Sequence, residues 1–575
     1  MRLFLFFLAA ASANAQLVSS IAIPKGPNLP VVFVNGYQAD CRSSNFPNTF
    51  GVFDQVLQSQ NRVSLFFDNC AFTTGAKPSI EELGNTFGLY LGSLKYTDGT
   101  VVPLVDVVAH SMGGLVVRSY LEGKQLDGTY NPPLTLPIRK IVFLATPNFG
   151  TPAALGFSFD KQLEELATGS VFVFDLNTWN QGIDDLRGLD VLAIAGNGGT
   201  GQAVLPRFDD GIVSLTSASI GFARPNRTRI LPVCHTGPGL ITLAALCPAG
   251  IAGIAEVKGP GDIPARMVTS FLGDGPDYNI FGQPASENEF LATSGGVELR
   301  AKAASGQYVP ITKATASSGP LKIRASAVAY SEYFPFFPTQ TFTLTAGGTD
   351  LTQTFRVNLG TVTTRVFKDG PQIARVLPSA ANITPLAVGS NSYISIYGTN
   401  LDDAQVTTGS TVLQVLATSA NQVNAILATD PATTVIPITV TTRTGADTIN
   451  VFTPPNVPAL FTQNSTGSGP ASALNAVTNI LVSPNTPLHG GDYVSLYLTG
   501  LSFGSVLRPN STFADISVTV AGRACPIQFA GVAPGYTVLD QINCQIPGGI
   551  SSTTAPVIVT VDGRASNTAT LAVAP

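Results

Sequence analysis

The chain has 575 residues, which corresponds to three or four domains at about 150 residues each. Only 12% of the residues are charged, about half the usual fraction, and 44% are hydrophobic, which excludes a chain kept disordered by its charge. The 31 Lys and Arg against 36 Asp and Glu give a net charge of −5, which argues against nucleic acid and anionic membranes as partners.

The first 15 residues have the composition of a secretory signal peptide. Arg2 is basic, residues 3–10 are apolar, and Ala13-Asn14-Ala15 matches an A-x-A cleavage site. A buried first helix is the alternative, but the apolar run is short and ends in small residues. We therefore expect a mature chain that begins at Gln16 and is exported to the extracellular space or the cell surface. Because no later run reaches about 18 apolar residues, no transmembrane segment is expected after the signal peptide.

Residues 16–276 alternate apolar runs with segments of helical character, such as 115–122 and 161–167. The runs suit strands that are buried on both faces of a parallel sheet, and they are residues 30–34, 104–108, 141–144 and 191–194. This alternation predicts an α/β domain in which helices flank a mostly parallel sheet.

A serine motif follows the second of these runs directly. Ala109-His110-Ser111-Met112-Gly113-Gly114 lies between a predicted strand and a predicted helix. A serine on such a tight turn exposes its hydroxyl above the sheet, and the free N–H groups of the helix suit a developing oxyanion. The usual pattern is G-x-S-x-G, so Ala109 is a departure that some bacterial lipases share. A buried turn serine is the alternative, but strand, turn and helix occur in the required order.

A nucleophilic serine needs a base, and the chain has three histidines. His110 lies inside the turn and is expected to point away from Ser111, while His489 lies in the distant tail. His235 remains by elimination, in a loop downstream of the strands. A surface-loop histidine is the alternative for this residue.

Two further segments resemble those of α/β-hydrolase-fold lipases and esterases of secreted bacterial type. Residues 145–152 (ATPNFGTP) are similar to the T-P-x-x-G-[ST]-P segment of these enzymes, and residues 208–213 (FDDGIV) are similar to the D-G-x-V turn that carries their acid. The resemblance covers about residues 30–274. It implies that Asp210 is the acid that orients His235, with Asp209 as its neighbour; Asp184, Asp185 and Asp190 are weaker candidates because they precede the strand.

The same resemblance implies where an oxyanion would bind. Asn35-Gly36-Tyr37 follows the first strand, where lipases usually carry His-Gly, so Asn35 is a second departure. The backbone N–H groups of Tyr37 and Met112 are the expected donors. Residues 151–189 are expected to cap the pocket; their apolar side chains suit either an acyl chain or ordinary core packing, and they are Phe157, Phe159, Phe172, Phe174, Leu176 and Trp179.

Six cysteines form three pairs that are close in sequence, namely Cys41 with Cys70, Cys234 with Cys247, and Cys525 with Cys544. Export to an oxidising compartment favours disulfides over buried thiols. Because six cysteines allow 15 connectivities, the local pairing is only the simplest prediction. No C-x-x-C spacing occurs and the histidines are scattered, so neither a metal site nor a cofactor is expected.

The rest of the chain reads as about three β-sandwich domains. Residues 277–372 alternate apolar and polar side chains, which predicts one sandwich. Residues 393–401 (YISIYGTNL) recur as residues 493–501 (YVSLYLTGL), an offset of 100 residues that matches one immunoglobulin-like module. Residues 373–455 and 456–575 therefore resemble IPT-type immunoglobulin-like modules, a resemblance that implies no chemistry.

Two classes of function follow. The first is a secreted serine hydrolase that cleaves carboxylic esters, lipase-like, acting on a small-molecule or lipid ester, with β modules for attachment to a cell surface or a polymer. An acyltransferase or a polyester depolymerase would use the same residues. The second class is a surface adhesion or carbohydrate-binding protein with an inactive hydrolase domain. Labelling of Ser111 by a fluorophosphonate distinguishes the two classes.

Overall fold

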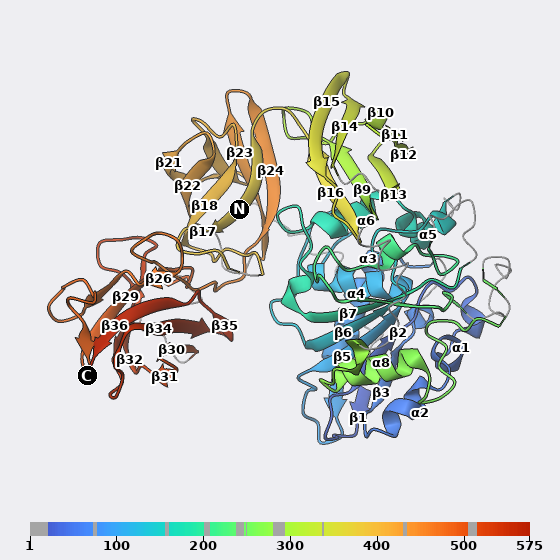
Figure 1. Ribbon diagram of the computed structural model, residues 1–575, viewed down its shortest axis with the longest axis horizontal. Coiled ribbons are helices and arrows are strands. Elements are labelled where there is room, and N and C mark those ends of the chain that lie inside the picture. The colour runs from blue at the N-terminus through green and yellow to red at the C-terminus, as the bar shows by residue number, and fades with distance from the viewer. Residues whose placement is uncertain are drawn as a thin grey trace, which may run out of the picture.

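The computed structural model describes residues 21–72, 77–155, 160–199, 208–236, 247–248, 250–279, 294–335, 339–383, 385–428, 434–503 and 515–575 (Figure 1). The expected signal peptide, residues 1–15, lies outside these residues, as do Gln16, Phe157 and Phe159.

A six-stranded sheet forms the centre of the N-terminal part, and every neighbouring pair of strands in it is parallel. The strands are, in spatial order, β3 (Ser64–Phe67), β2 (Val31–Val34), β5 (Val105–His110), β6 (Ile138–Leu144), β7 (Asp190–Gly196) and β8 (Thr228–Leu231). All residues of β2 and β5 are buried, as expected for strands that are covered on both faces.

Successive residues of each strand enter two different cores. Val32 and Val34 of β2 pack in one core with the helices α3 (Ile80–Ser93), α4 (Met112–Glu122) and α6 (Val171–Thr178). Val31 and Phe33 pack in the other core with α1 (Phe46–Phe50), α2 (Phe53–Gln58) and α8 (Ile263–Leu272). The period of two along each strand therefore places helices on both faces of the sheet.

Shorter elements complete this region. They are β1 (Ile21–Ile23), η1 (Cys41–Ser43), η2 (Asn69–Phe72), β4 (Leu94–Tyr96), η3 (Pro152–Ala154), α5 (Lys161–Leu166), η4 (Leu186–Gly188), α7 (Leu215–Ala218) and η5 (Asp277–Asn279).

The first β module, residues 294–367, consists of two four-stranded sheets around their own apolar core. One sheet has the order β11-β10-β14-β15 and the other β12-β13-β9-β16, in which β16 runs parallel to β9. The strands are β9 (Ser294–Ala301), β10 (Ile311–Ala316), β11 (Gly319–Pro320), β12 (Lys322–Arg324), β13 (Val328–Pro335), β14 (Thr339–Ala346), β15 (Thr349–Arg356) and β16 (Val362–Phe367).

The second β module, residues 372–452, repeats this plan with the sheets β17-β18-β22-β21 and β20-β19-β23-β24. Its strands are β17 (Gln372–Pro378), β18 (Ser392–Thr399), β19 (Gln405–Thr408), β20 (Thr411–Val412), β21 (Gln414–Thr418), β22 (Gln422–Leu427), β23 (Val435–Thr442) and β24 (Gly445–Phe452).

The third β module, residues 459–574, has one sheet in the order β25-β29-β33-β32 with β27 beside β29, and a second sheet built around β36, β34 and β30. Its strands are β25 (Ala459–Leu460), β26 (Gly469–Pro470), β27 (Ala473–Asn475), β28 (Leu488–His489), β29 (Tyr493–Thr499), β30 (Ile516–Val520), β31 (Arg523–Ala524), β32 (Ile527–Val532), β33 (Asp540–Gln545), β34 (Ser552–Val561), β35 (Arg564–Ala565) and β36 (Ala569–Ala574).

The predicted fold class is confirmed: an α/β region with a parallel sheet precedes an all-β region of several mostly antiparallel sheets. The domain boundaries expected at residues 276, 372 and 455 remain predictions. Across the described part of the chain, no helix combines the length and apolar character needed to cross a membrane.

Candidate active site

Ser111 occupies the sharp turn between β5 and α4. Its backbone has φ 55° and ψ −130°, a conformation that costs a non-glycine residue about 1–3 kcal/mol. The turn is held because Ser111 N–H donates to Leu144 O on β6 at 2.9 Å. The side chain is half-buried at the carboxyl end of the sheet, where α/β folds usually bind ligands.

Glycines let other segments approach this turn closely. A Cβ added to Gly36 would lie 2.7 Å from Ser111 Cβ, and one added to Gly113 would lie 2.5 Å from Val34 O. A Cβ on Gly114 would collide with the side chain of Thr146. The small residues of the motif thus let α4 begin directly against the ends of β2 and β6.

The structure brings Ser111, His235 and Asp210 together although they are far apart in sequence. His235 Nε2 lies 2.8 Å from Ser111 Oγ, and His235 Nδ1 lies 2.8 Å from Asp210 Oδ2. Both His235 and Asp210 are buried. The geometry is that of a hydroxyl, a base and an orienting carboxylate within hydrogen-bond distance of one another.

Backbone groups fix the two ends of the acid–base pair. Asp210 Oδ1 accepts from Ile212 N–H at 2.9 Å and Val213 N–H at 2.7 Å, while His235 N–H donates to Asp210 O at 2.8 Å. These bonds leave Oδ2 of Asp210 directed at the imidazole.

Asp209 is oriented differently from its neighbour. Its Oδ1 accepts from Gly211 N–H at 2.7 Å, and its buried Oδ2 has no hydrogen-bond partner. Burial, with a smaller contribution from the Asp210 charge, raises the pKa of Asp209 to about 6. Of the two adjacent carboxylates, only Asp210 lies against His235.

His110 contacts the backbone of the base. The sequence predicted that its ring points away from Ser111, and Nε2 lies 3.1 Å from His235 O. Burial, together with the nearby His235, lowers the pKa of His110 to about 3, so the ring is neutral at physiological pH. A neutral ring protonated at Nε2 donates to that carbonyl. Sequence reasoning missed this contact, for which the only signal was that His110 precedes the serine.

The loop after β2 lies against the serine turn at Gly36, and hydrogen bonds of Asn35 to the segment after β3 hold this loop in place. Asn35 Nδ2 donates to Asp68 Oδ1 at 3.0 Å, and Asn35 Oδ1 accepts from Asn69 N–H at 3.0 Å. Asn69 Nδ2 donates to Gly36 O at 2.7 Å. The departure at Asn35 therefore has a structural role that no local pattern indicated, because its partners follow a different strand.

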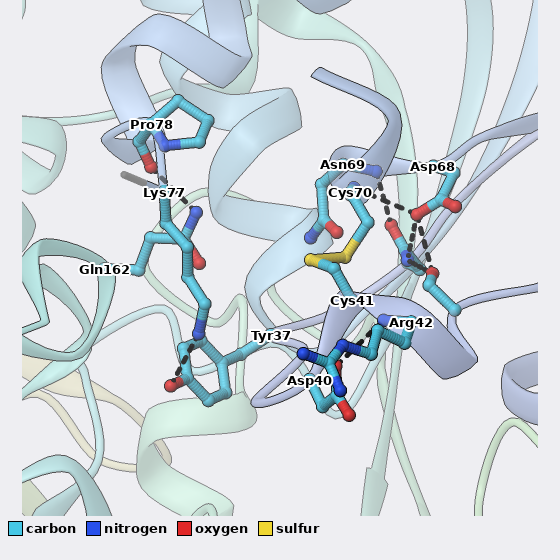
Figure 2. The surroundings of a disulfide bond; sticks show 12 residues. Tyr37, Asp40, Cys41, Arg42, Asp68, Asn69, Cys70, Lys77, Pro78 and Gln162 are labelled. Atoms are coloured by element: carbon cyan, nitrogen blue, oxygen red, sulfur yellow. Dashed lines mark hydrogen bonds between the residues drawn. A yellow bond between two sulfur atoms is a disulfide. The ribbon is translucent and has the colours of Figure 1, made fainter. Parts of the chain in front are cut away.

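The Tyr37 side chain is held by two polar residues, Lys77 and Asp160. Its hydroxyl donates to Asp160 Oδ2 at 2.8 Å and accepts from Lys77 Nζ at 2.9 Å. Lys77 Nζ lies 4.1 Å from the centre of the Tyr37 ring, and Figure 2 shows the two side chains next to each other. Burial raises the pKa of Tyr37, which stays protonated. These contacts fix the Tyr37 side chain next to Gly36, which approaches Ser111. The N–H groups of Tyr37 and Met112 remain the proposed oxyanion donors.

The three cysteine pairs that are close in sequence are disulfides in the structure. Cys41 is joined to Cys70, which ties the loop after β2 to the segment after β3 (Figure 2). Cys234 is joined to Cys247 next to His235, and Cys525 is joined to Cys544 in the third β module.

In the part of the predicted cap that the structure describes, the apolar side chains contribute mainly to packing. Phe172 and Leu176 of α6 lie in the same core as α3 and α4, and the Trp179 ring centre lies 5.7 Å from that of Phe452 in the second β module. Phe174 contacts Arg300 of the first β module. Core packing, the alternative for these side chains, therefore accounts for α6.

The weaker acid candidates have other partners. Asp184 Oδ2 accepts from the buried Arg118 at 2.9 Å, Asp185 caps η4 by accepting from Arg187 N–H, and Asp190 pairs with Arg227 at 3.0 Å. Within the described residues, no group of three or more His, Cys, Asp or Glu side chains is placed to hold a metal ion.

No protein-family model matches the sequence, and no curated protein matches it. Similar solved structures include phospholipase PlaB from Legionella pneumophila, at 14% identity and a TM-score of 0.42, covering 59% of this chain and 94% of that chain. The lin2722 gene product from Listeria innocua aligns at 17% identity and a TM-score of 0.22, covering 35% of this chain and 82% of that chain. The titin fragment A168169 aligns at 14% identity and a TM-score of 0.13, covering 36% of this chain and 100% of that chain. At these values no family is assigned, so the function is inferred from the geometry around Ser111.

Proposed function

We propose that this chain is a secreted serine hydrolase that cleaves carboxylic esters, as a triacylglycerol lipase or a carboxylesterase. The observation that carries the proposal is the continuous contact from Ser111 Oγ through His235 to Asp210, with both distances at 2.8 Å. The disulfides and the signal-like first residues are compatible with export. We further propose that the β modules attach the enzyme to a cell surface or a polymer.

The reaction follows the two-step course of serine hydrolases. His235 Nε2 removes the proton of Ser111 Oγ as the oxygen attacks the ester carbonyl, and the carbonyl electrons move onto its oxygen. The N–H groups of Tyr37 and Met112 stabilise that negative charge. The C–O bond to the alcohol then breaks, and the imidazolium gives its proton to the departing oxygen, leaving an acyl-enzyme. A water molecule, deprotonated by His235, releases the acid by the same steps.

Asp210 acts through the imidazole rather than on the substrate. Its carboxylate accepts the Nδ1 proton, which leaves the Nε2 lone pair facing Ser111, and it stabilises the imidazolium that forms in each step. Because Asp210 also accepts two backbone N–H groups, its carboxylate is held in place while the base changes charge.

Active-site labelling tests the proposal directly. A fluorophosphonate probe should modify wild type and a Ser59→Ala control, whose exposed serine ends α2, but not Ser111→Ala. Ser111→Ala should also lose nearly all turnover of p-nitrophenyl esters while unfolding at the wild-type temperature. Unchanged turnover by folded Ser111→Ala would refute the assignment of the nucleophile.

The substrate class needs a second measurement on the active enzyme. Turnover across p-nitrophenyl esters of increasing acyl length, with emulsified triglyceride alongside, separates a carboxylesterase from a lipase. A polyester film and an added acceptor alcohol test depolymerase and acyltransferase activity with the same residues.

A further inference from the structure

The duplicated segment of the tail builds the same outer surface twice. In β18, Tyr393, Ser395 and Tyr397 alternate with Ile394 and Ile396, which enter the core of the second β module. In β29, Tyr493, Ser495 and Tyr497 alternate with Val494 and Leu496 in the core of the third β module. Because side chains alternate across a strand, each module turns a Tyr-x-Ser-x-Tyr row away from its core. The central serines of the two rows, Ser395 and Ser495, are buried at 3% and 5% exposed, so the tyrosines form the accessible part of each row.

The neighbouring strands repeat a second row. Gln422 and Asn424 of β22 lie opposite Tyr397 and Ser395, and Gln541 and Asn543 of β33 lie opposite Tyr497 and Ser495. The amides are linked in the same way in both modules, since Gln422 donates to Asn424 and Gln541 donates to Asn543, each at 2.8 Å. These bonds hold the amides in place before any ligand binds.

Within β18 and β29 the inward residues differ, Ile394 and Ile396 against Val494 and Leu496, whereas the outward Tyr, Ser, Gln and Asn are kept. Sandwich cores accept any apolar residue of suitable volume, and outer faces usually accept any polar residue. The retained tyrosines and amides, which are partly or fully exposed, therefore indicate a surface with a ligand. Tyr397 and Tyr493 are 36% and 37% exposed, and Tyr536 on the hairpin after β32 is 58% exposed.

The two rows meet at the junction of the modules. The Tyr393 ring lies 6.3 Å from that of Phe461, and Phe461 N–H donates to Tyr497 O at 3.1 Å. Tyr393 N–H also donates to Thr499 Oγ1 at 2.9 Å. Burial, with the nearby Tyr536 phenol, raises the pKa of both Tyr393 and Tyr497, in keeping with aromatic groups gathered at this point.

The chemistry of these rows fits one kind of partner. Their Tyr, Ser, Gln and Asn side chains carry no charge, so an uncharged partner matches them better than an ionic one. Tyrosine rings pack against flat apolar C–H faces, while amides both donate and accept hydrogen bonds at hydroxyl groups. Tyr393 and Tyr397 are four residues apart on one strand, about 13 Å, which suits an extended polymer. Arg375, opposite Tyr397 on β17, adds a further donor at the margin.

We propose that the tyrosines of β18 and β29, with the Gln/Asn rows of β22 and β33, form a binding face for an uncharged, extended polysaccharide of β-1,4-linked glucan type. This gives a ligand class to the attachment role proposed for the tail, and it does not depend on the chemistry at Ser111.

Affinity electrophoresis of the full chain in native gels that contain hydroxyethyl cellulose tests the proposal. Wild type and Ser111→Ala should be retarded equally, which separates binding from hydrolysis. The double variant Tyr397→Ala/Tyr497→Ala should bind about tenfold more weakly, and Gln422→Ala/Gln541→Ala should also weaken binding. As a matched control, Thr343→Ala/Thr352→Ala removes an exposed cross-strand pair from the first β module and should bind as wild type does.

The tyrosine, amide and threonine variants are compared with wild type for their unfolding temperature and their ester turnover, both of which should be unchanged. The proposal is overturned if hydroxyethyl cellulose does not retard the wild type, or if the tyrosine and amide variants are retarded as strongly as the wild type. It is also overturned if only anionic carboxymethyl cellulose retards the chain, because that result would indicate an electrostatic site elsewhere.

Discussion

At the scale of single residues, the two adjacent carboxylates of residues 209 and 210 provide a matched pair. Only Asp210 reaches His235 Nδ1, so Asp210→Asn should leave the imidazole in the wrong tautomer and lower kcat on the order of 10⁴-fold. Asp209→Asn changes the same group one residue away and should keep most of the activity. Steady-state kinetics on both variants check this, and the reverse order of effects would identify Asp209 as the acid.

His110 is expected to be a positioning residue. Its ring holds His235 O at 3.1 Å, so His110→Ala should let the base shift and lower kcat about tenfold with little change in KM. His110→Gln keeps a donor of similar reach and should recover part of the loss. A purely structural role would lower stability equally in both variants without this difference in kcat, so kcat, KM and unfolding temperature are measured together.

The sequence allowed some of these residues to be predicted and not others, for a physical reason. The turn at Ser111 is a local pattern, and the scarcity of histidines left His235 as the remaining base. By contrast, the contacts of Asn35 with Asp68 and Asn69, and of His110 with His235 O, join different strands. Such contacts depend on the packing of the sheet, which no short motif records.

At the scale of elements, the segment that carries the base is held by both covalent and backbone bonds. Cys234 is joined to Cys247 by a disulfide. In addition, Cys234 N–H donates to Ala252 O at 2.9 Å, and Cys234 O accepts from Ile254 N–H at 2.8 Å. A bridge that closes a loop of about 15 residues is worth roughly 3 kcal/mol in the chain-entropy model.

Cys247→Ser should therefore lower the unfolding temperature and reduce kcat, because the segment next to His235 gains freedom. Cys544→Ser breaks a bridge in the third β module and is the matched control, with ester turnover expected to be unchanged. Equal kcat in the two variants would show that the backbone bonds alone position His235.

The strands of the central sheet were predictable because burial on both faces leaves continuous apolar runs such as Val31–Val34. The role of α6 was not, since an apolar helix over a pocket and one packed beneath another module have the same composition. Phe174 and Trp179 are covered by residues more than a hundred positions away, Arg300 and Phe452.

At the scale of the whole molecule, α6 and the turn after it join the α/β region to two β modules. Asn177 Nδ2 lies 3.4 Å from Glu298 Oε2 of β9, and Gln181 exchanges hydrogen bonds with the backbone of Val376 on β17. Figure 1 shows β9, β13 and β16 next to this helix. The first and second β modules are thus packed against the α/β region, and an ionisable group buried at this contact affects the stability of the contact.

Glu298 is that group. It is 1% exposed, its Oε1 has no hydrogen-bond partner, and burial raises its pKa to about 8. The unfolded chain releases this proton near pH 4.5, while the folded chain keeps it up to about pH 8. The contribution of Glu298 to the free energy of unfolding is therefore full below about pH 4.5. It is lost as the pH rises to 8, by roughly 1.4 kcal/mol per pH unit at most.

Glu298→Gln keeps the shape and cannot ionise, so it should flatten the decline of unfolding free energy between pH 5 and pH 8. Trp179 is the only tryptophan of the chain and lies buried two residues after Asn177, so urea unfolding followed by its fluorescence reports on this region. Glu164→Gln, on the exposed side of α5, should leave the pH dependence as in wild type. A wild-type slope in Glu298→Gln would mean that Glu298 is already ionised in the folded protein at neutral pH, with Arg118 and Asn177 compensating its charge.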